Sequence, residues 1–183
     1  MILGVTGTNG GGKGTVVDYL KTKGFIHYSV SGEIAKEAER RGLHPDRPTL
    51  GMIGNELRAL HGAGYFVALF KDRAAASGVR DLVIESIRSL GEAEALRSAG
   101  GALLAVDADR HVRYGRIIGR GSHKDKVDFE IWRMQEEKEW HNQAAHDMDV
   151  PGVMSRADFT IDNDGTLVEL HAKLDEVLAI LTS

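Results

Sequence analysis

The feature that most constrains this chain is a glycine-rich segment directly after its first apolar run. Residues 2–5 are apolar and predict a strand, and residues 13–23 have the pattern of a helix. The run between them is Gly7-Thr8-Asn9-Gly10-Gly11-Gly12-Lys13-Gly14-Thr15. Glycines placed in this way let consecutive backbone N–H groups converge on phosphate oxygens, and the following helix points its positive end at the same anion. The segment therefore predicts a phosphate-binding loop rather than an ordinary turn.

The lysine of this loop stands at the offset that nucleotide binding requires. Gly7, Gly12 and Lys13 match the spacing G-x-x-x-x-G-K-[ST], except that Gly14 takes the Ser/Thr position and Thr15 follows it. In such a loop the lysine ammonium bridges the terminal phosphates, and a hydroxyl at the helix start faces Mg²⁺. We expect the following residues to hold the phosphates of ATP: Thr8, Asn9, Gly10, Gly11, Gly12, Lys13, Gly14 and Thr15.

Short apolar runs alternate with helical patterns along the rest of the chain. Further strands are predicted at residues 25–28, 81–85, 101–107 and 159–162. Helices are predicted at residues 33–41, 48–60, 65–77, 92–99, 109–120, 128–145 and 167–181. This alternation favours the α/β class, with a central parallel sheet of about five strands covered by helices on both faces.

Length and composition exclude several classes of protein. The 183 residues suit one domain, and a formal net charge of −4 argues against a protein that coats long nucleic acid. The absence of cysteine excludes disulfides, thiolate metal sites and cysteine nucleophiles. The apolar runs are too short to span a bilayer, and the N-terminus does not match a signal peptide. We expect a soluble cytoplasmic protein, monomeric or homodimeric, that acts on small molecules.

The Gly-Lys-Gly-Thr ending of the loop resembles that of adenylate kinases and related nucleoside monophosphate kinases. The chain as a whole is similar to this P-loop superfamily, including its dephospho-CoA-kinase-like members. The resemblance implies the P-loop NTPase three-layer sandwich over residues 1–183, with an acceptor-binding helical segment at about 31–64 and a lid at about 116–140. It also implies ATP and Mg²⁺ as cofactors, with Thr15 beside the phosphates and the metal.

Two segments resemble the acceptor side of these kinases. Residues 31–36 are similar to the family's S/T-G-D-x-x-R segment, with Glu33 at the aspartate position and Lys36 at the phosphate-binding arginine position. Arg58, on the helix beyond the prolines, is a further acceptor-binding candidate. Residues 81–89 resemble the strand-end motif D-G-x-(P)-R, in which Arg88 would grip the acceptor phosphate. Glu85, a carboxylate at the end of an apolar strand, would hold Mg²⁺ through water; an ion pair between Glu85 and Arg88 is the structural alternative.

A cationic segment follows the fourth predicted strand. Six Lys/Arg and one acid lie between residues 110 and 126, and Arg113, Arg116 and Arg120 share a helical stripe about 60° wide. Such arginines repel one another unless an anion lies between them, although a solvated basic face is an alternative. Residues 116–120 also resemble the R-I-V-G-R segment that begins the adenylate kinase lid. That resemblance implies that Arg116 packs on adenine and that Arg120 contacts phosphate.

Other residues complete the expected lid and adenine site. Arg133 is a candidate for a further lid arginine, and residues 136–139 predict a solvated face. Trp132 and Trp140 are expected to pack the lid, with stacking on a base as the alternative. Residues 157–166 are similar to a segment of dephospho-CoA kinases that borders the adenine, which implies that Asn163 and Gly165 lie on the adenine side with Arg116. An ordinary Asn-Asp-Gly turn is the alternative.

These patterns favour a kinase that transfers the γ-phosphoryl group of ATP to a nucleoside monophosphate-like acceptor, with Mg²⁺. The expected catalytic residues are Lys13, Arg88, Arg116, Arg120 and Glu85. The alternatives are a dephospho-CoA kinase with a 3′-hydroxyl acceptor and Glu33 as base, another enzyme with the same loop (a nucleotide hydrolase or a polynucleotide 5′-kinase), and a non-enzymatic nucleotide-binding switch or assembly protein. Dephospho-CoA kinases usually carry an aspartate where Ser29 and Ser31 stand here, so the monophosphate is preferred.

Overall fold

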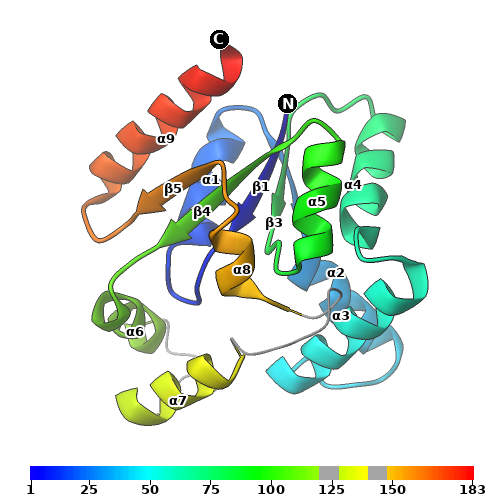
Figure 1. Cartoon of the computed structure of the whole chain (residues 1–183), viewed down its shortest axis with the longest axis vertical. Coiled ribbons are helices and arrows are strands. Elements are labelled where there is room, and N and C mark those ends of the chain that lie inside the picture. Colours follow the sequence, from blue (N-terminus) through cyan, green and yellow to red (C-terminus); the bar gives the residue numbers. More distant parts are fainter. Residues whose placement is uncertain (120–127, 140–147) are drawn as a thin grey trace.

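A five-stranded parallel sheet forms the centre of the computed structural model (Figure 1), which describes residues 1–119, 128–139 and 148–183. Its strands lie in the order β2-β3-β1-β4-β5, with all neighbours parallel. The predicted α/β class and sheet are confirmed. The strands are β1 (Ile2–Thr6), β2 (Ile26–Ser29), β3 (Leu82–Glu85), β4 (Ala102–Asp107) and β5 (Phe159–Asp162).

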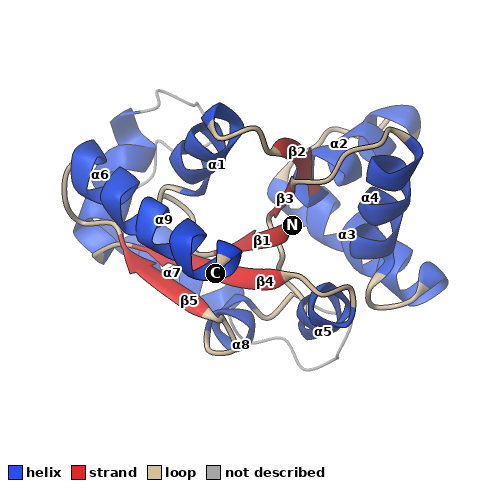
Figure 2. Cartoon of the chain, turned by 90° about the horizontal axis from the view of Figure 1, so that it is seen from above, coloured by secondary structure: helices blue, strands red, loops and turns tan. Residues whose placement is uncertain are grey.

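Helices cover both faces of the sheet because successive strand residues point to opposite sides. Val83 joins a hydrophobic cluster with residues of α1 and α9, whereas its neighbours Leu82 and Ile84 join a second cluster with residues of α2, α3, α4, α5 and α8. Figure 2 shows α1 and α9 on one side of the sheet and α5 and α8 on the other. The helices are α1 (Lys13–Thr22), α2 (Val30–Arg40), α3 (Arg47–His61), α4 (Tyr65–Ala76), α5 (Leu90–Ser98), α6 (Arg110–Gly119), α7 (Phe129–Glu139), α8 (Val150–Met154) and α9 (Leu167–Thr182).

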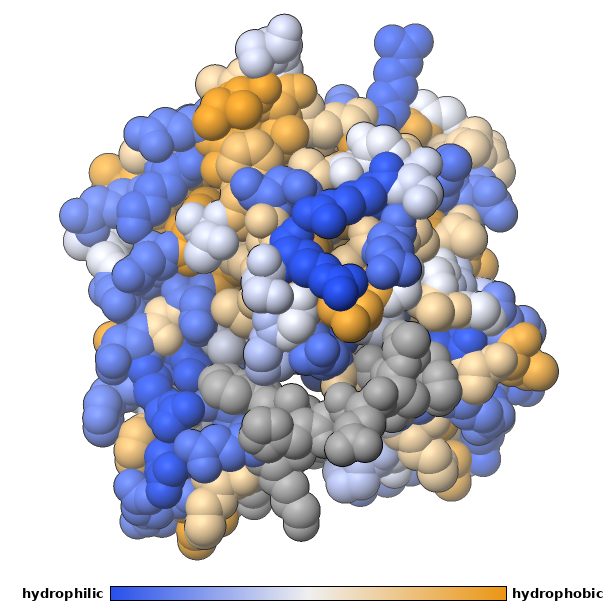
Figure 3. Space-filling model, in the orientation of Figure 1, coloured by the Kyte–Doolittle hydropathy of each residue, from blue (hydrophilic) through white to orange (hydrophobic). Residues whose placement is uncertain are grey.

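Most of the surface seen in Figure 3 is hydrophilic, and its most hydrophobic area lies near the C-terminal end of α9. Ile180 of that helix is 61% exposed. No helix among the described residues is both apolar enough and long enough to cross a membrane.

Side chains that cap the first turns of α2 and α8 explain two differences from the predicted helices. Helix α2 begins at Val30, three residues before the predicted start, because the Ser29 hydroxyl accepts a hydrogen bond from the Gly32 N–H at 3.1 Å. The short helix α8 was not predicted. It forms because the Asp149 carboxylate accepts from the Gly152 N–H at 2.8 Å and a proline stands in its first turn.

The parallel register brings the carboxyl ends of three strands to one edge of the sheet. Val5 of β1 lies beside Glu85 of β3, and Thr6 lies beside Ala105 of β4. The glycine loop, the segment after Glu85 and the end of β4 therefore meet at this edge, which is where open parallel sheets bind their ligands.

A buried ion pair attaches α3 to the loop between β3 and α5. The Arg58 Nε donates to Glu92 Oε1 at 2.8 Å, and the two side chains are 1% and 0% exposed. The other oxygen of Glu92 accepts from the backbone N–H groups of Arg88 at 2.9 Å and Ser89 at 3.2 Å. Ser89 in turn caps α5 by accepting from the Glu92 N–H, which completes a capping box. Glu92 thus holds α3 and the backbone of Arg88 together.

We predict that Glu92→Ala lowers the free energy of unfolding by about 3–5 kcal/mol, because it leaves a buried guanidinium without its counter-charge. Urea unfolding of the two proteins measures this difference. Glu94→Ala is the matched control, since that side chain lies on the same helix, is 70% exposed and pairs with the exposed Arg156. Equal effects of the two substitutions would show that the buried pair does not stabilise the fold.

Candidate functional site

The glycine loop adopts a backbone that side chains would block. Gly7, Gly10 and Gly12 have φ values of 140°, 82° and 106°, a region that L-residues with a Cβ rarely adopt. A Cβ on Gly7 would collide with the Val106 carbonyl oxygen, and one on Gly12 would collide with the Asn163 amide. Helix α1 begins directly after Gly12 with no side chain capping its first turn. The N–H groups of that turn are therefore suited to an anionic ligand.

Lys13 brings a positive charge to the same loop. Its Nζ donates to the carbonyl oxygens of Gly7 at 2.9 Å and Thr8 at 2.7 Å. The ammonium thus lies beside the loop that precedes it, and Thr15 is exposed in the first turn of α1. The structure brings together the residues that the sequence assigns to the phosphates, and that assignment stays a prediction.

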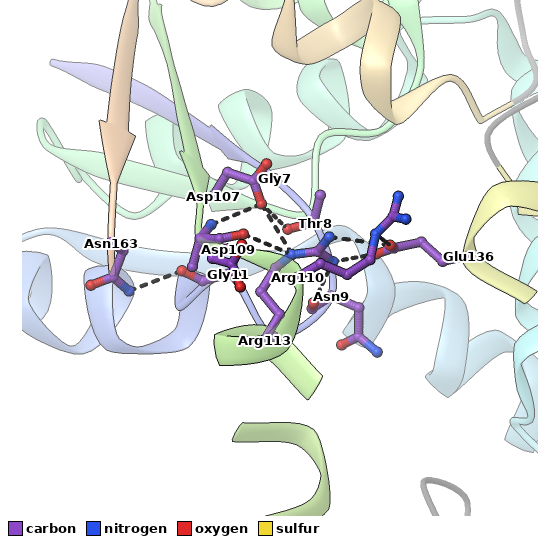
Figure 4. Close-up of polar contacts among 12 residues, drawn as sticks. Gly7, Thr8, Asn9, Gly11, Asp107, Asp109, Arg110, Arg113, Glu136 and Asn163 are labelled. Carbon is purple, nitrogen blue, oxygen red and sulfur yellow. Dashed lines mark hydrogen bonds and ion pairs between the residues drawn. The ribbon is translucent and has the colours of Figure 1, made fainter. Parts of the chain in front are cut away.

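Three side chains from other elements hold the loop in this shape (Figure 4). The Thr8 hydroxyl donates to Asp107 at the end of β4, and the Asn163 amide donates to the Gly11 carbonyl at 2.9 Å. The Arg113 guanidinium donates to the Asn9 carbonyl at 3.3 Å. Asp107 was missed by the sequence reasoning, although a carboxylate after an apolar strand is the same signal that identified Glu85.

A hollow of about 410 Å³ lies on the α9 side of the loop, which we call the α9-side hollow. Arg116 crosses it and donates to the Asn163 carbonyl at 2.7 Å and the Gly10 carbonyl at 3.5 Å. The three residues predicted for the adenine side therefore line one hollow beside the phosphate loop. Its lining residues are Gly12, Thr15, Arg116, Gly119, Asn163, Gly165, Leu167 and Leu170.

A second cavity, of about 430 Å³, lies on the opposite side of the loop, and we call it the α3-side cavity. Arg58 and Arg88, two of the predicted acceptor-binding residues, line it. Sequence reasoning missed Asn55 and Ser86 as lining residues, although Ser86 lies inside the strand-end motif, two residues before Arg88. The other lining residues are Gly7, Thr8, Asn9, Val30, Ser31, Ile34, Pro48, Leu50, Gly51, Trp132, Glu136, Met148 and Val150.

Glu33 and Lys36 do not line this cavity, so the structure does not bring them together with Arg58 and Arg88. The residues of α2 that line the cavity are Val30, Ser31 and Ile34. Glu33 accepts from the Arg73 guanidinium of α4 at 2.6 Å, and Lys36 is 76% exposed and 3.7 Å from Glu33. The hydrogen bond from Arg73 holds the pKa of the Glu33 carboxyl below its usual value. Glu33 is therefore a poor base.

Glu85 is held by a histidine of the neighbouring strand. Its Oε2 lies 3.1 Å from His27 Nε2. This hydrogen bond lowers the pKa of Glu85 below its usual value, and the charges of Lys13 and Arg88 act in the same direction, while burial raises it. Glu85 is therefore ionised at neutral pH, as a magnesium-organising carboxylate must be.

Ser86 stands where the strand-end motif has glycine, and it has a φ of 69°. It is buried, its N–H donates to the Val5 carbonyl at 3.0 Å, and its hydroxyl lies 3.4 Å from that of Ser31. A residue with a Cβ costs about 1–2 kcal/mol in this conformation. Such strain gathers at functional sites because neighbouring contacts hold it in place.

Arg113 and Glu136 form a buried ion pair between α6 and α7. Two N–H groups of Arg113 contact the carboxylate, and the side chains are 3% and 6% exposed. The Nε of Arg110 also lies 3.6 Å from Oε2 of Glu136. The carboxylate of Glu136 therefore lies between Arg110 and Arg113 and supplies the anion that these two arginines need. The prediction of a solvated face at residues 136–139 is wrong for Glu136, because a pattern of charges does not show which one meets a buried partner.

The remaining lid expectations have different outcomes. Trp132 is 2% exposed and packs against Phe129 and Tyr114, as expected. Arg133 pairs with Glu130 and Glu137 and lines neither cavity, and its expected place over the phosphates stays a prediction. Arg120, Trp140 and much of the expected lid lie outside the described residues.

The metal site stays a prediction. Among the described residues, no group of three or more His, Asp and Glu side chains could hold a metal ion. Mg²⁺ in phosphate-transfer sites is usually bound through one or two carboxylates and the phosphates themselves. Thr15 in the α9-side hollow and Glu85 at the end of β3 are compatible with that pattern.

Comparison with known proteins agrees with this geometry. Residues 3–141 match the family described as AAA domain. A UPF0200 protein of Pyrobaculum aerophilum is 32% identical over 180 residues, which cover 97% of this chain and 96% of the relative.

Two solved structures share the fold. TT1252 from Thermus thermophilus has a TM-score of 0.64 and 23% identity, with 100% of this chain and 98% of that one covered. A dephospho-CoA kinase from Campylobacter jejuni has a TM-score of 0.54 and 17% identity, with 98% and 96% covered. The loop at the carboxyl edge of the sheet and these matches lead to one conclusion: the chain belongs to the AAA domain family of P-loop NTPases and to the UPF0200 proteins.

Proposed function

We propose that this protein is an ATP- and Mg²⁺-dependent kinase that transfers the γ-phosphoryl group to a nucleoside monophosphate-like acceptor. The observation that carries the proposal is the position of the phosphate loop between two cavities. Gly12 and Thr15 line the α9-side hollow, and Gly7, Thr8 and Asn9 line the α3-side cavity. A hydrolase or a nucleotide switch needs one nucleotide site, whereas a transferase needs a donor site and an acceptor site that meet at the transferred group.

The donor nucleotide is proposed to occupy the α9-side hollow. There Arg116, Asn163 and Gly165 would contact the adenine, and the backbone of the glycine loop would hold the phosphates. Phosphoryl transfer depends on positioning and on stabilisation of charge, which Lys13 would supply at the terminal phosphates and Arg120 would complete. Mg²⁺, when bound, supplies further neutralisation of the phosphate charge, and Thr15 and Glu85 are the residues proposed to hold it.

The α3-side cavity favours an acceptor whose attacking oxygen is already ionised. Among its described lining residues, the one carboxylate is Glu136, and Arg113 holds it with two N–H groups. A hydroxyl acceptor such as dephospho-CoA would need a carboxylate placed to take its proton, and both oxygens of Glu136 already accept hydrogen bonds from Arg113. A phosphate oxygen needs no base, which supports the monophosphate acceptor.

Arg88 is the proposed contact for the acceptor phosphate. Arg58 lines the same cavity, but Glu92 already balances its charge. Glu92 also holds the Arg88 backbone N–H, so the buried pair positions Arg88. We therefore assign the direct contact to Arg88 and a supporting role to Arg58.

Lys13→Ala is expected to lower the turnover number by about 100-fold or more, because it removes the cation at the terminal phosphates. The fold should remain, since the ammonium contacts the carbonyls of its own loop. The measurement is ADP release from ATP and Mg²⁺ with AMP, GMP, CMP, UMP or dephospho-CoA, and thermal unfolding monitors the fold. Lys21→Ala, an exposed lysine of the same helix that pairs with Asp18, is the control.

Wild-type turnover in the Lys13 variant would remove that residue from the mechanism. Release of ADP by the wild-type protein without an acceptor would indicate a hydrolase. Tight ATP binding with no turnover on any acceptor would indicate a nucleotide-binding switch.

Arg88→Ala is expected to lower kcat/KM for the acceptor by about 10–100-fold, the loss for a hydrogen bond to a charged group, with little change in ATP affinity. Steady-state kinetics with each substrate varied in turn provide the measurement. Lys36→Ala is the control, because that side chain lies on the exposed face of α2 and should leave the acceptor KM unchanged. An equal loss of ATP binding would place Arg88 on the donor side.

A further inference from the structure

Every carbonyl of the glycine loop accepts a hydrogen bond. From residue 7 to residue 12, the donors are Lys13 for Gly7 and Thr8, Arg113 for Asn9, Arg116 for Gly10, Asn163 for Gly11 and the Val16 N–H for Gly12. Three of these donors stand 104, 106 and 152 residues further along the chain than the carbonyls they bind. The shape of the loop therefore depends on α6 and on the turn after β5.

The hydrogen bond from Asn163 fixes one peptide plane of the loop. In a trans peptide, the C=O group and the N–H group of the next residue point in opposite directions, and the described chain has no cis peptide bond. Since the Gly11 carbonyl faces the Asn163 amide at 2.9 Å, the Gly12 N–H points to the opposite side. Gly12 directly precedes the first turn of α1, which no side chain caps. This N–H therefore lies next to the donors of that turn, which are suited to an anion.

Asn163 is itself held by its backbone on two sides. Its N–H donates to the Asp107 carbonyl at 2.8 Å, and its own carbonyl accepts from Arg116 at 2.7 Å. The residue is 6% exposed, and Figure 4 shows its side chain directed at Gly11. Because a carbonyl only accepts, the nitrogen of the side-chain amide must face Gly11. The donor thus has a fixed position before any ligand binds, which lowers the entropy cost of using it.

The same amide also packs against the next residue of the loop. A Cβ on Gly12 would collide with the side-chain nitrogen of Asn163. One side chain therefore makes a polar contact with residue 11 and a steric contact with residue 12, and both contacts act on the peptide that joins them.

We propose that Asn163 is a positioning residue for the phosphates of the bound nucleotide. It holds the peptide between Gly11 and Gly12 so that the Gly12 N–H donates to a phosphate oxygen. This role acts at the phosphate end of the nucleotide and is separate from the proposed adenine contact. The inference rests on the proposed function only in that the glycine loop binds the phosphates.

The test uses a ligand that has phosphates but no base. Calorimetric titration of the full chain with tripolyphosphate and with ATP, each with Mg²⁺, is compared between the wild type and Asn163→Leu, which keeps a side chain of similar size and removes the donor. Without that donor the peptide between Gly11 and Gly12 is free to turn, and the Gly12 hydrogen bond to the phosphate is lost. The affinity for tripolyphosphate should fall about 10-fold or more, as for a hydrogen bond to a charged group, and the affinity for ATP should fall at least as much.

Ile161→Val is the matched control for stability. It removes a buried methylene from β5, two residues before Asn163, where the side chain belongs to the core cluster shared with α1 and α9. It should lower the temperature of thermal unfolding and leave the tripolyphosphate affinity unchanged. A second measurement needs no substitution: in nuclear magnetic resonance of the wild-type protein, the backbone amide signal of Gly12 should shift on addition of tripolyphosphate.

The inference is overturned if Asn163→Leu binds tripolyphosphate as tightly as the wild type, even where it binds ATP more weakly, because Asn163 would then act at the base. It is also overturned by an equal loss in Ile161→Val, or by a Gly12 signal that does not move at saturating tripolyphosphate. If the wild type still releases ADP with a monophosphate, the kinase proposal then stands alone. If the affinity falls as expected but no acceptor supports ADP release, the inference stands as a property of the loop and the kinase proposal fails.

Discussion

The rest of the site depends on a loop whose backbone cannot accommodate side chains at three positions. Gly7, Gly10 and Gly12 all have positive φ, and the space beyond two of them is already filled by Val106 and Asn163. The loop is therefore pressed against β4 and the turn after β5, and the Lys13 ammonium lies against the carbonyls of Gly7 and Thr8. Main-chain donors held in this way are pre-organised for phosphate, because no side chain has to move aside when the anion arrives.

At the carboxyl ends of the strands, that loop lies between the α9-side hollow and the α3-side cavity. Asn163 and Arg116 support it from the α9 side, and Arg113 and Asp107 support it where β4 passes into α6. Since the same loop borders both cavities, a group bound against the loop in one lies close to a group bound against the loop in the other. This shared border is the physical basis for proposing transfer between two ligands rather than hydrolysis of one.

Buried charge pairs set the positions of the helices around these cavities. The pair of Arg58 and Glu92 attaches α3 to the loop that carries Arg88, and the pair of Arg113 and Glu136 attaches α7 to α6. Replacing one partner leaves a buried charge uncompensated, which costs more than the pair itself contributes. Both pairs therefore define where a cavity wall lies, and Arg58, which was expected to bind the acceptor, is already paired within the protein.

The sequence by itself determined the α/β class, the parallel sheet and the phosphate loop, because strand periodicity and glycine spacing are local properties of the chain. It also indicated Arg88 and Arg116, which lie within motifs of fixed spacing. Only the tertiary structure decided that Glu33 and Lys36 do not line the α3-side cavity, that Glu136 is buried, and that Trp132 lines that cavity. The physical reason is that a residue's exposure and partner depend on which distant element packs against it. The rotation of α2 and the docking of α7 follow from contacts between segments far apart in the chain, and no local pattern records them.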